Sequence, residues 1–193
     1  MKPSSNLTYL TKASARIGND INLIQGAGGN TSLKEGNILW VKGSGKWLSL
    51  AEKENIFVGV ELTKIDNILF DNGGELKPSI ETSLHALMPH KFVIHVHSTS
   101  SIALSVQEQG KSIISELLSD LNWLWVPYIK PGPKLSAKIQ QLSKNKKYDV
   151  LILANHGLVI GADTCLEAES LLAKVELALN IPIEENTGKL THS

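Results

Sequence analysis

The feature that most constrains the fold is the alternation of short strand-like runs with amphipathic helical segments. Residues 92–98, FVIHVHS, are rich in β-branched side chains and predict a buried strand. Similar short runs predict further strands at 31–34, 38–42, 56–60, 123–128, 149–154 and 157–160. Apolar periodicity and capping residues predict helices at 5–21, 62–70, 78–88, 98–106, 112–121, 133–143 and 165–179, with a short one from Ser49. Since these elements mix without a regular βαβ repeat, we expect an α/β fold around a mixed or largely antiparallel sheet.

The chain length fits a single domain. With 193 residues, 42% of them hydrophobic, the chain can bury a sizeable core. We expect one domain over 1–193, with its core at about 7–180 and a frayed tail at 184–193. The N-terminal segment lacks the apolar core of a signal peptide, and no run reaches membrane-spanning length, so we expect no membrane partner.

Charge and cysteine content narrow the function further. Lys plus Arg and Asp plus Glu number 19 each, so no basic excess indicates a nucleic-acid partner. The single Cys165 excludes an intrachain disulfide and a thiolate metal cluster, and it fits a reducing, cytoplasmic location. Any metal must therefore be held by nitrogen and oxygen ligands.

Two histidines lie at alternate positions of the predicted strand 92–98. Because strand side chains alternate between faces, His95 and His97 point the same way. Two neutral imidazoles compete for hydrogen-bond partners, and protonating both would bring like charges together in a poor solvent. A shared divalent metal resolves this conflict, whereas a lone strand histidine is usually satisfied by a backbone carbonyl.

A third ligand must come from elsewhere in the chain. His156 stands where the apolar run 149–154 meets a glycine, a strand end at which a side chain can turn into a cleft. Three histidines with one open position are typical of a catalytic zinc site. His85 and His90 are the alternatives, and a surface-turn histidine is the simpler interpretation of His156 taken alone.

Glu81 is the candidate acid/base. It comes early in the predicted helix 78–88, which leads directly into the histidine-bearing strand. A partly desolvated carboxylate beside a metal can transfer protons, although an acidic residue there could simply favour the helix dipole. His85 lies one turn later, and we expect it to support the site or to pack in the core.

Three loops of small residues could together hold a phosphate. Residues 26–30, GAGGN, expose backbone N–H groups but lack the spacing of a dinucleotide fingerprint. The second loop is residues 42–46, KGSGK, and the third is Pro78-Ser79. A tight turn explains residues 26–30 equally well when they are taken alone, and the other two loops strengthen the phosphate interpretation.

The motifs GGNTS, KGSG, KPSIE…H, HVHS, VPYIKPGPKLS and ANHGLVIGADTCLEA resemble, in order and approximate spacing, those of the class II aldolase/adducin family. The resemblance covers about residues 7–180. The chain resembles the zinc-dependent sugar-phosphate aldolases, such as fuculose-1-phosphate and rhamnulose-1-phosphate aldolase, and also the ribulose-5-phosphate 4-epimerases. The wording PSIETSLHALMPHKFVIHVH is closer to the aldolase domains of bifunctional aldolase–dehydrogenase proteins.

The resemblance implies a role for each matching residue. His95, His97 and His156 would bind one divalent metal, usually zinc. Glu81 would be the catalytic acid/base, and a metal ligand when substrate is absent. The phosphate and ketose site would be lined by Asn30, Ser44, Gly45 and Ser79, with Gly29 shaping the first loop. The family fold is an α/β sandwich around an antiparallel sheet, commonly assembled as a homotetramer with active sites near subunit contacts.

Departures from the family pattern limit the functional prediction. Ile80 replaces a second phosphate-binding serine. We expect neither a following dehydrogenase domain nor the tail that supplies a catalytic tyrosine in some aldolases. We predict a metal-dependent aldolase that acts on a ketose phosphate or similar sugar-derived substrate through a metal-stabilised enediolate. The alternatives are an epimerase, dehydratase or decarboxylase on the same site, or a metal-free, adducin-like binding module.

Overall fold

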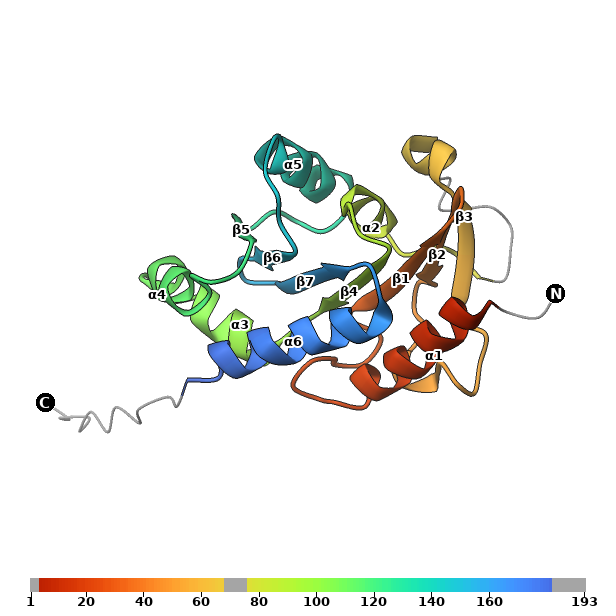
Figure 1. Cartoon of the computed structure of the whole chain (residues 1–193), viewed down its shortest axis with the longest axis horizontal. Coiled ribbons are helices and arrows are strands. Elements are labelled where there is room, and N and C mark those ends of the chain that lie inside the picture. Colours follow the sequence, from red (N-terminus) through yellow and green to blue (C-terminus); the bar gives the residue numbers. More distant parts are fainter. Residues whose placement is uncertain (1–3, 68–75, 182–193) are drawn as a thin grey trace, which may run out of the picture.

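The computed structural model describes residues 4–67 and 76–181, and a seven-stranded sheet forms its centre (Figure 1). The strand order is β3-β2-β1-β4-β7-β6-β5. The strands are β1 (Asn30–Glu35), β2 (Ile38–Lys42), β3 (Phe57–Glu61), β4 (Phe92–Val96), β5 (Trp123–Val126), β6 (Val150–Leu153) and β7 (Gly157–Ala162). Neighbouring strands are antiparallel except for the parallel pair β5 and β6. The predicted α/β fold with a largely antiparallel sheet is therefore confirmed.

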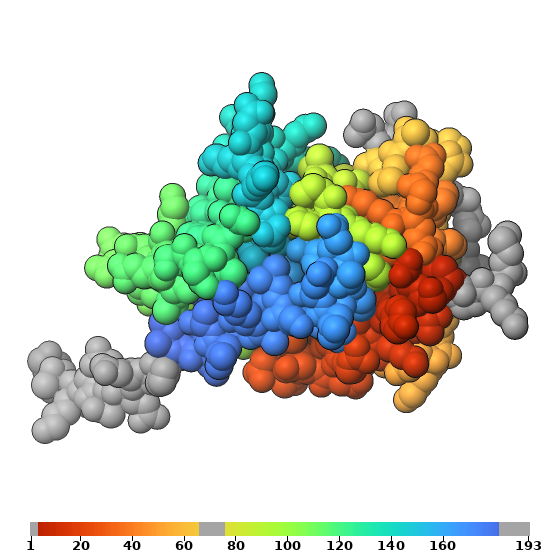
Figure 2. All heavy atoms as spheres, viewed as in Figure 1, coloured from red at the N-terminus to blue at the C-terminus, as the bar shows by residue number. Residues whose placement is uncertain are grey.

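Helices cover both faces of this sheet. They are α1 (Ser5–Gly18), α2 (Thr82–Leu87), α3 (Thr99–Ser105), α4 (Gly110–Leu117), α5 (Pro133–Ser143) and α6 (Cys165–Leu179), with short 3₁₀ helices η1 (Leu48–Leu50) and η2 (Leu62–Asn67). α1, α3, α4 and α6 form one layer, and α2 and α5 pack on the opposite face. The space-filling view shows α1 and α6 lying against each other over the first face (Figure 2).

The period-two geometry of strand β4 divides its side chains between two hydrophobic clusters. Phe92, Ile94 and Val96 pack into the cluster beneath α1, α3, α4 and α6. Val93 packs into the cluster beneath α2 and α5. Because His95 has the parity of Val93, its side chain lies on the α2 side of the sheet, where the site is found.

Strand β1 binds α2 through a row of alternate polar side chains, which we call the β1 polar row: Asn30, Ser32 and Lys34. Asn30 contacts Glu81 at the start of α2, and Ser32 contacts His85 one turn later. The Lys34 ammonium donates to the carbonyls of Ala86 and Met88 at the end of the helix. The row thereby satisfies carbonyls that a helix end leaves without intrahelical partners.

Several predicted boundaries were wrong. The predicted helix 78–88 begins only at Thr82, because Pro78 forms a β-bridge with Gly43 and Ser79 closes a turn whose carbonyl accepts from Thr82. Strand β4 ends at Val96, since the His97 N–H donates to the Leu23 carbonyl instead.

Other predictions fall partly outside the described residues. The predicted helix 62–70 is a 3₁₀ helix over Leu62–Asn67, and its remainder lies outside them, as does the tail 184–193. Among the described residues, none of the helices is both long and apolar enough to cross a membrane.

Candidate functional site

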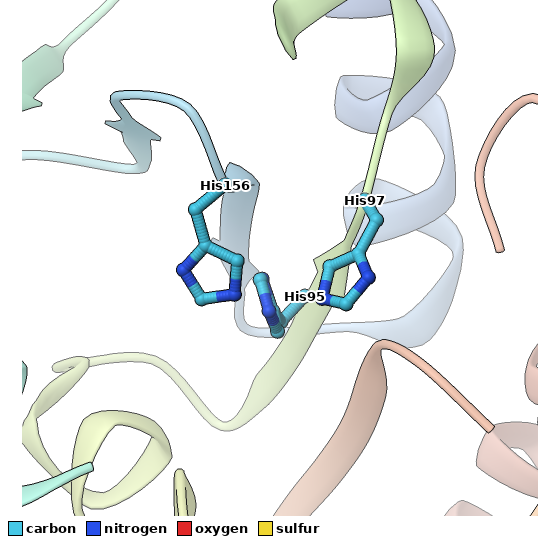
Figure 3. A group of neighbouring side chains, drawn as sticks. All are labelled: His95, His97 and His156. Atoms are coloured by element: carbon cyan, nitrogen blue, oxygen red, sulfur yellow. The ribbon is translucent and has the colours of Figure 1, made fainter. Parts of the chain in front are cut away.

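Three histidines from two segments of the sheet converge at one point (Figure 3). His95 belongs to β4, His97 directly follows that strand, and His156 lies in the turn between β6 and β7. Their ring centroids are 4.9–5.1 Å apart. One nitrogen from each ring can be chosen so that all three lie within 4.8 Å of one another. This spacing suits three ligands of a single metal ion.

The pairing of β4 with β7 explains why His156 reaches the other two histidines. In this antiparallel pair His95 lies opposite Val159, which brings the turn before β7 to the end of β4. Gly157 takes a φ of +144°, and a Cβ there would lie 2.2 Å from the Val96 carbonyl oxygen and 3.0 Å from the His97 Cα. Only glycine permits this backbone conformation and this close approach.

The donor set of the cluster matches what a metal requires. His95 Nδ1 donates to the Leu158 carbonyl at 3.0 Å, so its Nε2 is directed into the cluster. His95 Nε2, His97 Nε2 and His156 Nδ1 are buried and make no hydrogen bond within the described part of the chain. Burial, followed by the charge of His95, lowers the pKa of His97 and of His156 to about 4, so both rings are neutral at pH 7.

Glu81 places a carboxylate directly beside these rings. It occupies the N-cap position of α2, yet its side chain caps no backbone N–H. Its Oε2 lies 3.4 Å from His95 Nε2, and its Oε1 lies 3.5 Å from His156 Nε2. Burial works against ionisation, but His95, His156 and the Asn30 amide hold the Glu81 pKa well below its usual range. Burial likewise opposes the charge on His95, but Glu81 outweighs it and raises the His95 pKa.

The other predicted site residues divide into a buried group and an exposed group. Gly29, Asn30 and Ser79 are buried, and the Asn30 amide nitrogen lies 3.3 Å from Ser79 Oγ and 3.0 Å from Glu81 Oε2. Ser44 and Gly45 are exposed. Their loop reaches the third one through the Ser44 N–H, which donates to the Lys77 carbonyl at 2.8 Å. The structure therefore places all three loops side by side, and Glu81 lies next to Asn30 and Ser79, which are buried members of the first and third loops.

The two alternative histidines are engaged elsewhere. His85 is fully buried and contacts Ser32 and Asn30 through its two ring nitrogens. His90 Nε2 lies 2.8 Å from the carboxylate of Asp149. His156, and neither of these, completes the cluster.

Residues 9–183 match the class II aldolase and adducin N-terminal domain. The chain belongs to this family. The family predicted from the sequence motifs is thus confirmed, and the match covers residues 9–183.

Individual relatives agree with this assignment. YuxG of Bacillus subtilis (strain 168), named an uncharacterized oxidoreductase, is 30% identical over 201 residues, which cover 88% of this chain. The chain spans only 29% of the length of that relative. The L-fuculose phosphate aldolase of Methanocaldococcus jannaschii is 26% identical, with 89% of this chain and 88% of the aldolase covered. The N-terminal class II aldolase domain of a Thermoplasma acidophilum protein superposes with a TM-score of 0.76 at 28% identity, covering 93% of this chain and 94% of that one.

Sequence reasoning overlooked Lys42 as an individual residue within this family fold. It ends β2 with a relative exposure of 2%, and its ammonium donates to the carbonyls of Ala27 and Lys46. The side chain therefore joins the first glycine loop to the second. Burial lowers the Lys42 pKa to about 8, although Glu81 partly opposes that shift. The sequence did contain a signal for this buried lysine, because Lys42 ends an apolar strand immediately before a glycine loop.

Proposed function

We propose that this chain is a metal-dependent lyase of the aldolase type, which breaks a carbon–carbon bond in a ketose phosphate or a similar sugar-derived substrate. The observation that carries this proposal is the convergence of three imidazoles beside a buried carboxylate. Three nitrogen ligands for a metal, together with an adjacent carboxylate base, suit a reaction that adds or removes a proton at a carbon next to a carbonyl.

The residues present fit a divalent metal, of which zinc is the first candidate. His95, His97 and His156 would hold it, because each has a buried ring nitrogen without a hydrogen-bond partner in the described structure. When bound, the metal would supply Lewis-acid charge to the carbonyl and hydroxyl oxygens of the substrate. Metal binding would also take the place of the proton that Glu81 favours on His95.

Glu81 would take up and return the proton at the carbon next to the carbonyl. Its Oε1 makes no hydrogen bond within the described residues, so that oxygen can accept a proton. Its Oε2 is held by the Asn30 amide at 3.0 Å. One oxygen therefore fixes the orientation of the carboxylate, and the other is free for the reaction.

The three small-residue loops would bind the anionic end of the substrate. Gly29, Asn30, Ser44, Gly45 and Ser79 lie on these adjoining loops, and the Lys42 ammonium lies between two of them. Ile80, directly after Ser79, is 50% exposed and offers no side-chain donor to a phosphate. We infer that this pocket holds its anion with fewer side-chain donors than a serine pair would give.

The similarity to an L-fuculose phosphate aldolase along nearly its full length supports an aldolase over an epimerase, dehydratase or decarboxylase. The Bacillus subtilis relative is named an oxidoreductase, but this chain matches only 29% of its length, so that name carries no argument about the reaction proposed here. We also propose a cytoplasmic homotetramer, in keeping with the free Cys165 and with the assembly implied by the resemblance.

The metal site is tested first, without any substrate. His95→Ala combined with His97→Ala should abolish stoichiometric zinc binding, as measured by calorimetry and by elemental analysis of the purified protein. His90→Asn is the matched control, because it removes a histidine that lies outside the cluster. Full zinc occupancy in the double variant, or no affinity of the wild type for zinc, cobalt or manganese, would overturn the site.

The reaction is tested with metal-loaded protein. We expect it to join dihydroxyacetone phosphate to a small aldehyde, or to cleave a ketose phosphate, with products identified by mass. A ketose phosphate that changes only its stereochemistry would identify an epimerase instead. Retention of the metal with no turnover of any of these substrates would count against an aldolase.

A further inference from the structure

A buried chain of hydrogen bonds leads from strand β1 through α2 to the proposed base. Ser32 Oγ lies 2.7 Å from His85 Nδ1, and His85 Nε2 contacts Asn30 Oδ1. Asn30 Nδ2 then reaches Glu81 Oε2 at 3.0 Å. Ser32 and His85 have no exposed surface, Asn30 has 3% and Glu81 has 6%. These hydrogen bonds are therefore shielded from bulk solvent.

The chemistry of these groups permits only one direction of donation. The Glu81 carboxylate accepts hydrogen bonds, so the NH₂ group of Asn30 must face it, and the Asn30 oxygen must face His85. That oxygen is also an acceptor only, so His85 Nε2 must carry the proton. Burial, reinforced by the charge of His95, lowers the His85 pKa to about 3 and keeps the ring neutral. Nδ1 of a neutral ring with a protonated Nε2 is an acceptor, so Ser32 donates to it.

We propose that His85 is a positioning residue that sets the orientation of the Asn30 amide and, through it, the orientation of the Glu81 carboxylate. Every donor in the chain points toward Glu81, so one ring tautomer determines which group meets the carboxylate. The proposal depends on the proposed function only for the reaction that Glu81 performs.

The pairing of β1 with β4 also ties this series of hydrogen bonds to the histidine cluster. Asn30 lies directly opposite His95 in the pairing of β1 with β4. The amide that holds Glu81 is therefore fixed to the same pair of strands as the first of the clustered histidines. His85 thus aligns the carboxylate with the imidazoles, although it contacts neither the substrate nor the cluster.

The first test uses the metal-free protein and needs no substrate. Two-bond ¹H–¹⁵N correlation spectra at pH 7 should show a neutral His85 with its proton on Nε2. A proton on Nδ1, or a doubly protonated ring, would overturn the proposal. This measurement requires only the wild type, so it decides even where a variant fails to fold.

The second test follows the side-chain amide protons of Asn30. In His85→Leu their exchange with solvent should become about tenfold faster, because a buried hydrogen bond to the amide oxygen is lost. His85→Gln can still donate to Asn30 and should restore protection, and His90→Leu is the control for removal of an imidazole elsewhere. Wild-type protection of Asn30 in His85→Leu would refute the positioning role.

Catalysis supplies the third test where turnover is found. His85→Leu should lower kcat by about 10- to 100-fold and leave KM and zinc content unchanged, and His85→Gln should recover much of the rate. A change in KM alone would contradict the proposal. No turnover by the wild type would count against the proposed function alone, because the spectra decide the role of His85 independently.

Discussion

Replacing Gly157 by alanine should lower both the stability of the fold and the affinity of the proposed metal site. The new Cβ would lie 2.2 Å from the Val96 carbonyl oxygen, so the two backbones must separate by roughly 1 Å to restore normal contact. Backbone strain at a φ of +144° costs about 1–3 kcal/mol, and forced displacement in a packed interior adds about 1–3 kcal/mol. Because the same Cβ would lie 3.0 Å from the His97 Cα, the shift would also move a proposed ligand.

Gly36→Ala is the matched control. Gly36 also has a positive φ, +57°, but a Cβ there meets nothing within 4 Å, so only the conformational cost of about 1–2 kcal/mol applies. Urea unfolding followed by tryptophan fluorescence should show that Gly157→Ala loses about 2–3 kcal/mol more than the control, which is the difference between the midpoints of the two ranges.

Zinc titration calorimetry of the same two variants tests the site. Zinc affinity should fall about 10- to 100-fold in Gly157→Ala, because the ligand geometry is disturbed, and should stay at the wild-type value in Gly36→Ala. Equal stability and equal zinc affinity of the two variants would refute the idea that the close approach of β7 to β4 builds the cluster.

Three further predictions concern single residues near the site. Glu81→Gln should keep zinc but lose proton exchange at the donor carbon, as measured by deuterium incorporation, and wild-type exchange would remove Glu81 from its role. Burial lowers the Lys42 pKa from 10.5 in the unfolded chain to about 8 in the folded protein. Between about pH 8 and 10.5 the unfolded chain therefore binds more protons than the folded protein, so the free energy of unfolding should rise with pH through that window. Relative to Lys42→Met, metal-free wild type should therefore gain about 1–2 kcal/mol in urea unfolding between those pH values after allowance for solvent screening, and a constant difference would contradict this. Ile80→Ser should tighten the binding of inorganic phosphate about tenfold by adding one donor, and unchanged affinity would place the anion elsewhere.

Much of the cluster could be predicted because it follows from local rules. Strand periodicity alone placed His95 and His97 on one face, and the glycine after His156 marked a strand end. The choice of Glu81 as the base was less local, because it depended on the family motifs as well as on the position of Glu81 before the histidine-bearing strand. Helix and strand types were predictable for the same local reasons.

What could not be predicted depends on contacts between distant segments. The start of α2 was misplaced because the bridge between Pro78 and Gly43 is invisible to helical periodicity. The contact of Ser32 with His85 depends on how β1 aligns with α2, and neither segment encodes that alignment by itself. The burial of Lys42 similarly requires two loops to meet around its ammonium.

The β1 polar row has a consequence for how this fold can change its selectivity. Asn30, Ser32 and Lys34 hold α2 from its N-cap residue, Glu81, to its last carbonyls. These contacts join the proposed base and the histidines into one unit. Ser44, Gly45 and Ile80 lie outside that unit on exposed loop positions. We expect substitutions at those three positions to change which sugar binds, while Glu81 and the three histidines keep their relative positions. Under the proposed function, the reacting groups and the residues that choose the substrate would therefore lie on separate parts of the fold.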